Sequence, residues 1–430
     1  MDAVHRPQSL QGGGSKISVV AVVIGNALEV FDLIIFAQFA VLIGKTFFPS
    51  VSEYAQLMLT VTTYGVGFLV RPLGALTIGI YADRIGRKAA LTLTIMLMAV
   101  GSAIVGLTPS YNTIGISAPI LVVFARMLCG FSAGGELGAA TTYLLEMAPT
   151  KRRGLYASWQ FASQGVGIFA GGLIGLGLTS TLAADDMQSW GWRVPFLMGT
   201  LIAPIGLYIR KQLGETLHTH ETASNKDTLI RLWRDHKFDL LWGSIAFIGP
   251  TTSSYIISTY MTTYALTVLK LPSSVSMAAG LIAGGTTIFA ALIGGYLADK
   301  FGRRIMTLVP EILLIVLIYP LFIMVVDSKS ASILLGMVAV LTFIRMMVSA
   351  SLASQVPETF PASLRTTGMS VCYSLATSIF GGTAQIIVTW LINATGNSAA
   401  PAFFLIGTGL LTLTALFMLK ARRPDQALEH

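Results

Sequence analysis

The feature that most constrains this chain is a series of apolar segments, each about 20 residues long or more, that recurs along its whole length. In lipid, a segment of this length satisfies its own backbone hydrogen bonds only as an α-helix. Charged residues make up 11% of the sequence and hydrophobic residues 54%, whereas a soluble chain carries about 25% charged residues. The sequence therefore predicts an all-α polytopic membrane protein.

We expect twelve membrane-spanning helices, divided into two sets of six by the polar stretch 211–238. The predicted spans are 17–44, 57–82, 89–108, 118–145, 154–182, 192–210, 239–268, 275–298, 305–326, 331–357, 363–394 and 400–420. The predicted organisation is a cytoplasmic tail (1–16), a six-helix bundle (17–210), a cytoplasmic linker (211–238), a second six-helix bundle (239–420) and a cytoplasmic tail (421–430) that ends like the remnant of a tag.

The basic residues predict the orientation of these spans. If both termini lie in the cytoplasm, 21 of the 28 Lys and Arg residues face the cytoplasm and 4 face outside, with Arg71, Arg126 and Arg345 inside spans. Cytoplasmic loops of membrane proteins carry this kind of basic excess. The net charge of +8 therefore reflects topology, and we expect the lipid bilayer but no nucleic acid as a partner.

A short motif occurs twice in the chain. GIYADRIGRK (79–88) follows the second predicted span, and GYLADKFGRR (295–304) follows the eighth, 216 residues later. A second pair, EMAPTKRRG (146–154) and ETFPASLRTTG (358–368), ends the fourth and tenth spans. Both repeats enter the membrane in the same direction, and parallel repeats of this kind place a substrate site between two bundles near the midplane.

The two loops resemble the signature of the major facilitator superfamily, which occurs at these two places in a twelve-helix fold. The resemblance implies a gating role for a set of loop residues. They are Gly79, Asp83, Arg84, Arg87, Gly295, Asp299 and Arg303. The glycines would allow close helix approach, and the aspartates would hold a turn that switches between two conformations.

Further segments resemble the metabolite–proton symporter branch of this superfamily, and within it the citrate–proton and tricarballylate–proton symporters. They are GNALEVFD (25–32), GFLVRPLGA (67–75), GFSAGGELG (130–138), WGWRVPF (190–196) and SLATSIFGGTA (374–384). This resemblance implies uptake of a small carboxylate anion across the bacterial cytoplasmic (inner) membrane. It implies the proton as coupling ion, no other cofactor, and a mechanism for which a monomer suffices.

Five positions in the site region depart from the pattern of that branch: Val30, Phe31, Arg345, Ser374 and Gln385. A dicarboxylate, itaconate or an aromatic acid therefore stays open as an alternative substrate. A non-transporting sensor would need a signalling domain, for which the linker and tails leave no room. The spans carry no nucleophile–base set and no cluster of metal ligands, so we expect neither an enzyme nor a metal site.

Seven ionisable residues lie deep in the predicted spans: Glu29, Asp32, Arg71, Arg126, Glu136, Glu311 and Arg345. Each costs roughly 2.5–3.5 kcal/mol on insertion, so each needs a partner or a wet cavity. No span contains His, and the only Lys, Lys420, is the last residue of the last span, so a carboxylate must carry the coupling proton. The candidates are Asp32, Glu29 and Glu136, whereas Glu311 is expected to be peripheral.

Glu29 and Asp32 are three residues apart, which predicts one shared helical face. We expect Asp32 to pair with Arg126 and to be the coupling residue. The alternative is that both acids are permanent partners of Arg126 and Arg71.

Arginine stays charged and binds carboxylates through paired hydrogen bonds. We expect Arg345 to contact the substrate directly, while Arg71 has either a binding or a structural role. The full set of predicted substrate-binding residues is Arg345, Arg126, Arg71, Asn26, Gln160, Gln164, Tyr255, Tyr373 and Ser374. Each of the neutral residues could equally form a hydrogen bond between helices.

Overall fold

The structure is a computed structural model that describes residues 14–49, 51–85, 87–134, 144–145, 148–149, 152–200, 204, 232–361 and 364–419. All regular secondary structure within these residues is helical. The first half of the chain contains α1 (Gly14–Gln38), α2 (Ala40–Phe47), α3 (Glu53–Ile85), α4 (Arg87–Leu107), α5 (Tyr111–Ile114), α6 (Ser117–Ala133), α8 (Arg153–Thr181), α9 (Ala184–Ser189) and η2 (Gly191–Arg193).

The second half contains two spans that are divided into shorter helices. Its elements are α12 (Lys237–Ala246), α13 (Ile248–Tyr255), η3 (Ile256–Tyr260), α14 (Met261–Thr267), α15 (Ser273–Phe301), α16 (Arg303–Ser328), α17 (Ala331–Gln355), η4 (Pro357–Thr359), α18 (Arg365–Ala376), η6 (Thr377–Gly381), α19 (Gly382–Thr395) and α20 (Ala400–Met418). The segments η3 and η6 are single π-helical turns.

Eight helices among the described residues are long and apolar enough to cross a membrane, and α1 with α2 forms a ninth span bent by 64°. Where both ends of a span are described, they lie within about one helical turn of the predicted ends. Large apolar side chains point outward, and Leu107, Phe289 and Val316 are 67%, 68% and 63% exposed. Such exposure is what a lipid-facing surface requires.

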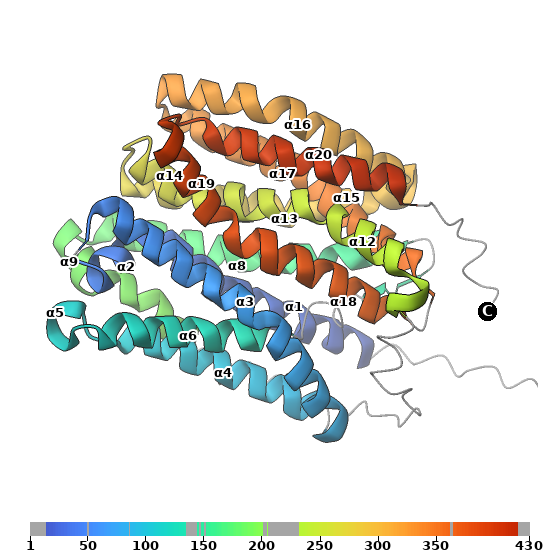
Figure 1. Ribbon diagram of the computed structural model, residues 1–430, viewed down its shortest axis with the longest axis horizontal. Helices are drawn as coiled ribbons and strands as arrows, with labels where there is room; N and C mark the ends of the chain where they lie inside the picture. Colours follow the sequence, from blue (N-terminus) through green and yellow to red (C-terminus); the bar gives the residue numbers. More distant parts are fainter. Residues whose placement is uncertain are drawn as a thin grey trace, which may run out of the picture.

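The helices gather into two bundles, which Figure 1 shows side by side. The first half (blue to green) contributes α1, α3, α4, α6 and α8, and the second (yellow to red) contributes α13, α15, α16, α17 and α20. The bundles meet along two seams, where α8 packs against α15 and α3 packs against α19.

Glycines permit the close contact along the first seam. A Cβ atom on Gly284 in α15 would lie 2.2 Å from the backbone nitrogen of Phe169 in α8, and one on Gly172 would lie 2.3 Å from that of Leu281. Only glycine fits at such distances, as is common where membrane helices pack tightly. The seam therefore holds the two bundles at a fixed, short separation.

Candidate functional site

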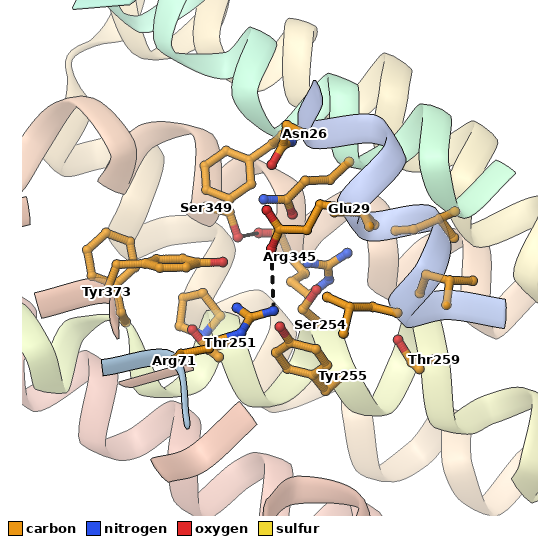
Figure 2. Close-up of a pocket in the computed structure, with 18 of the residues that line it drawn as sticks. Asn26, Glu29, Arg71, Thr251, Ser254, Tyr255, Thr259, Arg345, Ser349 and Tyr373 are labelled. Carbon is orange, nitrogen blue, oxygen red and sulfur yellow. Dashed lines mark hydrogen bonds and ion pairs between the residues drawn. The ribbon is translucent and has the colours of Figure 1, made fainter. Parts of the chain in front are cut away.

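A small cavity of about 50 Å³ lies between the two bundles, and Figure 2 shows its walls. The first bundle contributes residues of α1, α3 and α8, and the second contributes residues of α13, η3, α17 and α18 together with Phe247. The polar residues of the lining are Asn26, Glu29, Tyr64, Arg71, Gln164, Thr251, Ser254, Tyr255, Thr259, Arg345, Ser349 and Tyr373. The cavity thus lies where the parallel repeats predict a substrate site.

Arg345 enters the cavity from α17 and is 1% exposed. One guanidinium nitrogen, Nη2, donates to Ser258 Oγ at 3.0 Å. Nε has no hydrogen-bond partner, and no acidic side chain among the described residues lies within ion-pair distance. A buried cation without a countercharge is costly, so this arrangement favours an anion as its partner.

Arg71 enters the same cavity from α3, in the opposite bundle (Figure 2). Its guanidinium lies over the Phe68 ring at 4.3 Å, and Nη2 lies 3.5 Å from Glu29 Oε1. That distance is at the long limit for a hydrogen bond. A bound carboxylate could therefore compete with Glu29 for this arginine.

Asp32 lies apart from this cavity and pairs with Arg126, as expected from the sequence. Arg126 Nη1 lies 2.7 Å from Asp32 Oδ2, and both side chains are buried. Ser102 in α4 donates to the other carboxylate oxygen, Oδ1. Both oxygens of Asp32 are therefore occupied by donors, and neither Asp32 nor Arg126 lines the central cavity.

Glu29 and Asp32 are three residues apart on α1, yet their side chains reach different surroundings. Three residues turn an α-helix through about 300°, so the two side chains diverge by about 60°. In this bundle that angle separates two environments, because Glu29 faces the cavity and Asp32 faces α4 and α6. A small hollow of about 10 Å³ beside Asp32 and Ser102 is distinct from the central cavity.

The predicted neutral residues divide between the cavity wall and the helix packing. Asn26, Gln164, Tyr255 and Tyr373 line the cavity. Asn26 also donates through Nδ2 to Gln160 O at 3.1 Å and to Ser163 Oγ at 2.6 Å, which ties α1 to α8.

Two other predicted residues lie outside the cavity lining. The Gln160 amide is buried with no partner among the described residues, and Ser374 is half-buried in α18. Neither is among the residues that line the cavity.

The second predicted gating loop joins the two bundles at their cytoplasmic end. The Asp299 carboxylate accepts hydrogen bonds from the backbone N–H groups of Gly154 (2.8 Å) and Leu155 (2.9 Å), at the start of α8. Gly295 lies against Gly154, where an added Cβ would come within 2.7 Å of a backbone oxygen. Arg303 forms an ion pair with Glu358. These contacts close the cytoplasmic end on the α8–α15 side.

The opposite end holds a larger hollow of about 960 Å³ between the bundles. Its lining includes Gln38, Lys45 and Glu53 from the first bundle and Lys270 and Asn393 from the second. This is the end predicted to face outside. We use the term outward-facing for this arrangement, with the hollow at that end and the described contacts on the α8–α15 side of the other end.

Several predicted residues are beyond what the structure describes. Gly79 lies within α3, but its surroundings and the side chains of Asp83, Arg84 and Arg87 are outside the described residues, as is all of Glu136.

Sequence reasoning missed Ser102 and Ser258, which contact Asp32 and Arg345. A lone serine in an apolar run, such as Ser102, gives no signal. The run TTSSYIISTYMTT (251–263) does, because its density of hydroxyls is unusual for a span.

The family follows from comparison with known proteins. A model of the Major Facilitator Superfamily matches residues 22–383. The chain belongs to the major facilitator superfamily. Like the other members of this family, it is a multi-pass membrane protein with twelve spans in two halves.

Two curated bacterial relatives are similar over almost their whole length. The chain is 37% identical to a citrate-proton symporter of Klebsiella pneumoniae, over 95% of this chain and 93% of that protein. It is 36% identical to a citrate-proton symporter of Salmonella typhi, over 98% and 97%. This agrees with the resemblance drawn from the motifs, and places the chain in the bacterial inner membrane.

The fold matches that of solved transporters of the superfamily. A D-xylose-proton symporter superposes with a TM-score of 0.75 at 16% identity, covering 96% of this chain and 99% of that one. A partially occluded inward-open structure of the E. coli xylose transporter XylE gives 0.75 at 14% identity, covering 95% and 97%. At these identities the likeness establishes the fold alone.

Proposed function

We propose that this protein imports citrate or a similar tricarboxylate together with protons, by alternating access. The observation that carries the proposal is Arg345, a buried guanidinium with no acidic partner among the described residues, in a cavity that Arg71 enters from the other bundle. Two cations on opposite walls suit an anion with several carboxylates. The similarity to citrate-proton symporters supports the same substrate class.

The neutral residues of the cavity complete the substrate site. Thr251, Ser254 and Tyr255 line one wall, and Asn26 and Gln164 line the other. Hydroxyl and amide groups can donate to the carboxylate oxygens that the arginines leave free, and can accept from the hydroxyl group of citrate. A site that satisfies the polar groups of its ligand discriminates against smaller acids, because those would leave some of its own groups unpaired.

Protons enter this scheme through two carboxylates. A proton on Glu29 weakens its contact with Arg71 and frees that arginine for the substrate. A proton on Asp32 weakens its ion pair with Arg126 and loosens the packing of α1 against α6. With both acids neutral and the substrate bound, the charges in the centre are compensated, which permits the bundles to rock and the Asp299 contacts to separate.

The test is uptake of radiolabelled citrate into proteoliposomes with an imposed pH gradient, acid outside. We expect the gradient to drive accumulation, and unlabelled tricarboxylates to compete better than dicarboxylates or aromatic acids. Uptake that ignores the gradient would contradict proton coupling. If an aromatic acid competes best, the substrate is an aromatic acid, as for other members of the same branch. The absence of counterflow would favour a sensor.

The same uptake assay tests whether Arg345 contacts the substrate. Arg345→Lys keeps the charge but loses the planar fork, so we expect uptake to fall at least about tenfold, as for loss of a hydrogen bond to a charged group. Arg304→Lys, an exposed position on α16, is the matched control and should transport normally. Normal uptake by the Arg345 variant would rule out a direct contact.

A further inference from the structure

Glu311 lies in α16, inside the second bundle and away from the central cavity. The sequence led us to expect a peripheral residue, but the structure buries it completely. Neither carboxyl oxygen has a hydrogen-bond partner, and no basic side chain among the described residues lies within ion-pair distance. An ionised carboxylate in such surroundings costs several kcal/mol, so the site suits the neutral, protonated acid.

Two glycines make the space that the carboxyl group occupies. A Cβ atom on Gly249 in α13 would lie 3.1 Å from Glu311 Oε1, and one on Gly409 in α20 would lie 3.2 Å from the same atom. Any larger residue at either position would press on the carboxyl group. The pocket is therefore shaped by three helices, α13, α16 and α20, around this one side chain.

The helices around Glu311 offer no charge to balance it. Helix α20 contains no ionisable residue, α13 contains only Tyr255, and α17 contains only Arg345, which donates to Ser258. The remaining ionisable residues on α12, α15 and α16 are Lys237, Asp239, Tyr296, Asp299, Lys300, Arg303, Arg304, Tyr319 and Asp327. None of them forms an ion pair or hydrogen bond with Glu311.

The pocket is linked to the central cavity through a break in the seventh span. Helix α12 ends at Ala246 and α13 begins at Ile248, and the Gly249 N–H donates to Thr412 Oγ1 at 2.8 Å. Phe247, Pro250 and Thr251, which flank Gly249, line the central cavity. One short break thus contacts Glu311 on one side and the substrate site on the other.

We propose that Glu311 is a further proton-binding site, separate from Glu29 and Asp32, whose proton stabilises the outward-facing arrangement in which the cavity accepts its substrate. This inference rests on the proposed function. Loss of the proton places a charge in a closed pocket, which favours an arrangement in which the break in the seventh span opens to water. The outward-facing state is then the protonated one, so substrate affinity falls as the pH rises through the range in which Glu311 loses its proton.

The first test is citrate affinity of the purified protein from neutral to alkaline pH. We expect wild-type affinity to fall with pH, by up to about tenfold per unit for one fully coupled proton. Glu311→Gln should reduce this dependence to the part that comes from Glu29 and Asp32, and Glu311→Asp should keep it. Glu311→Met replaces the glutamine variant if that variant does not fold. A wild-type slope in the neutral variants would overturn the inference.

A control and a substrate-independent readout complete the experiment. Asp327→Asn changes an exposed acid at the far end of the same helix and should leave affinity and slope unchanged. The wild type should lose thermal stability as the pH rises above the range in which an exposed glutamate titrates, and Glu311→Gln should lack this loss. Identical curves for the two proteins would contradict the proposed site. Failure of the wild type to bind citrate, with this difference intact, would count against the proposed substrate alone.

Discussion

At the scale of single residues, Asp32 illustrates how a buried acid is surrounded by hydrogen-bond donors. Arg126 occupies one carboxylate oxygen and Ser102 the other. The Arg126 guanidinium also lies over the Phe36 ring at 4.7 Å, which fixes its position. Both donors interact more strongly with a carboxylate than with a neutral carboxyl group, so the serine favours the charged form relative to a site without it.

Replacing Ser102 by Ala should therefore make protonation of Asp32 easier. The carboxylate loses one hydrogen bond, worth about 1.5–3 kcal/mol for a charged acceptor, and each 1.36 kcal/mol corresponds to one pH unit. If a proton on Asp32 is needed for uptake, the pH at which uptake falls by half should rise by about one unit or more. Uptake rates in proteoliposomes across a range of pH measure this.

Ser132→Ala is the matched control for that experiment. Ser132 Oγ donates to the Thr94 backbone oxygen, also between α4 and α6, so its loss should leave the pH profile unchanged. A Ser102 variant with the wild-type profile would show that Asp32 does not limit the proton step.

The sequence predicted a contact between two buried residues correctly where their opposite charges alone decide it. Asp32 and Arg126 pair because each is costly in lipid without the other. The division between Glu29 and Asp32 could not be predicted, because it depends on where α3, α4 and α6 lie around α1. Glu311 was misjudged for the same reason, since its burial comes from the packing of α13 and α20 against α16.

At the scale of helices, the seam between α8 and α15 shows how backbone contact replaces side-chain interdigitation. Gly284 meets the backbone of Phe169, which cannot move aside as a flexible side chain could. A Cβ atom on its neighbour Gly285 would lie 3.5 Å from the Phe169 ring, which is an ordinary van der Waals contact. Two adjacent glycines therefore have different tolerance for a methyl group.

Gly284→Ala should destabilise the protein, whereas Gly285→Ala should not. Overpacking of this kind costs about 1–3 kcal/mol, which should lower the thermal unfolding midpoint in detergent and reduce uptake. The Gly285 variant controls for the change in helix propensity at the next position. Equal stability of the two variants would contradict the rigid seam described for α8 and α15.

Hydropathy predicted where the helices cross the membrane, since length and apolar content are local properties of the sequence. The π-helical turns η3 and η6 could not be predicted, because a wider turn depends on the packing around it. Both turns lie in spans that line the cavity, as is frequent for such turns.

At the scale of the whole molecule, the two ends of the protein are in opposite states. Gly154 and Leu155 bind Asp299 at the cytoplasmic end, while the hollow of about 960 Å³ separates the bundles at the other. Hydrogen bonds from a helix N-terminus to a carboxylate are strengthened by the charge. The Asp299 contact therefore favours the outward-facing arrangement.

Asp299→Asn should shift the population toward the inward-facing arrangement, by about tenfold if one charge-assisted hydrogen bond is lost. Spin labels on the cytoplasmic ends of the two bundles would report this as longer distances. The native Cys129 and Cys372 are buried, so they should not compete for the label. Asp186→Asn, at an exposed acid of α9, is the control, and an unchanged distance distribution in Asp299→Asn would contradict the role of this contact.

The two π-helical turns have an evolutionary consequence. Both lie in the second half of the described chain, in spans that line the cavity together with Arg345, whereas the Asp32–Arg126 pair lies in the first half. If both halves descend from one ancestral repeat, the copies have since diverged in helix geometry around a shared site. Substitutions in the second copy could then change which acid is recognised while the Asp32–Arg126 pair of the first is inherited intact.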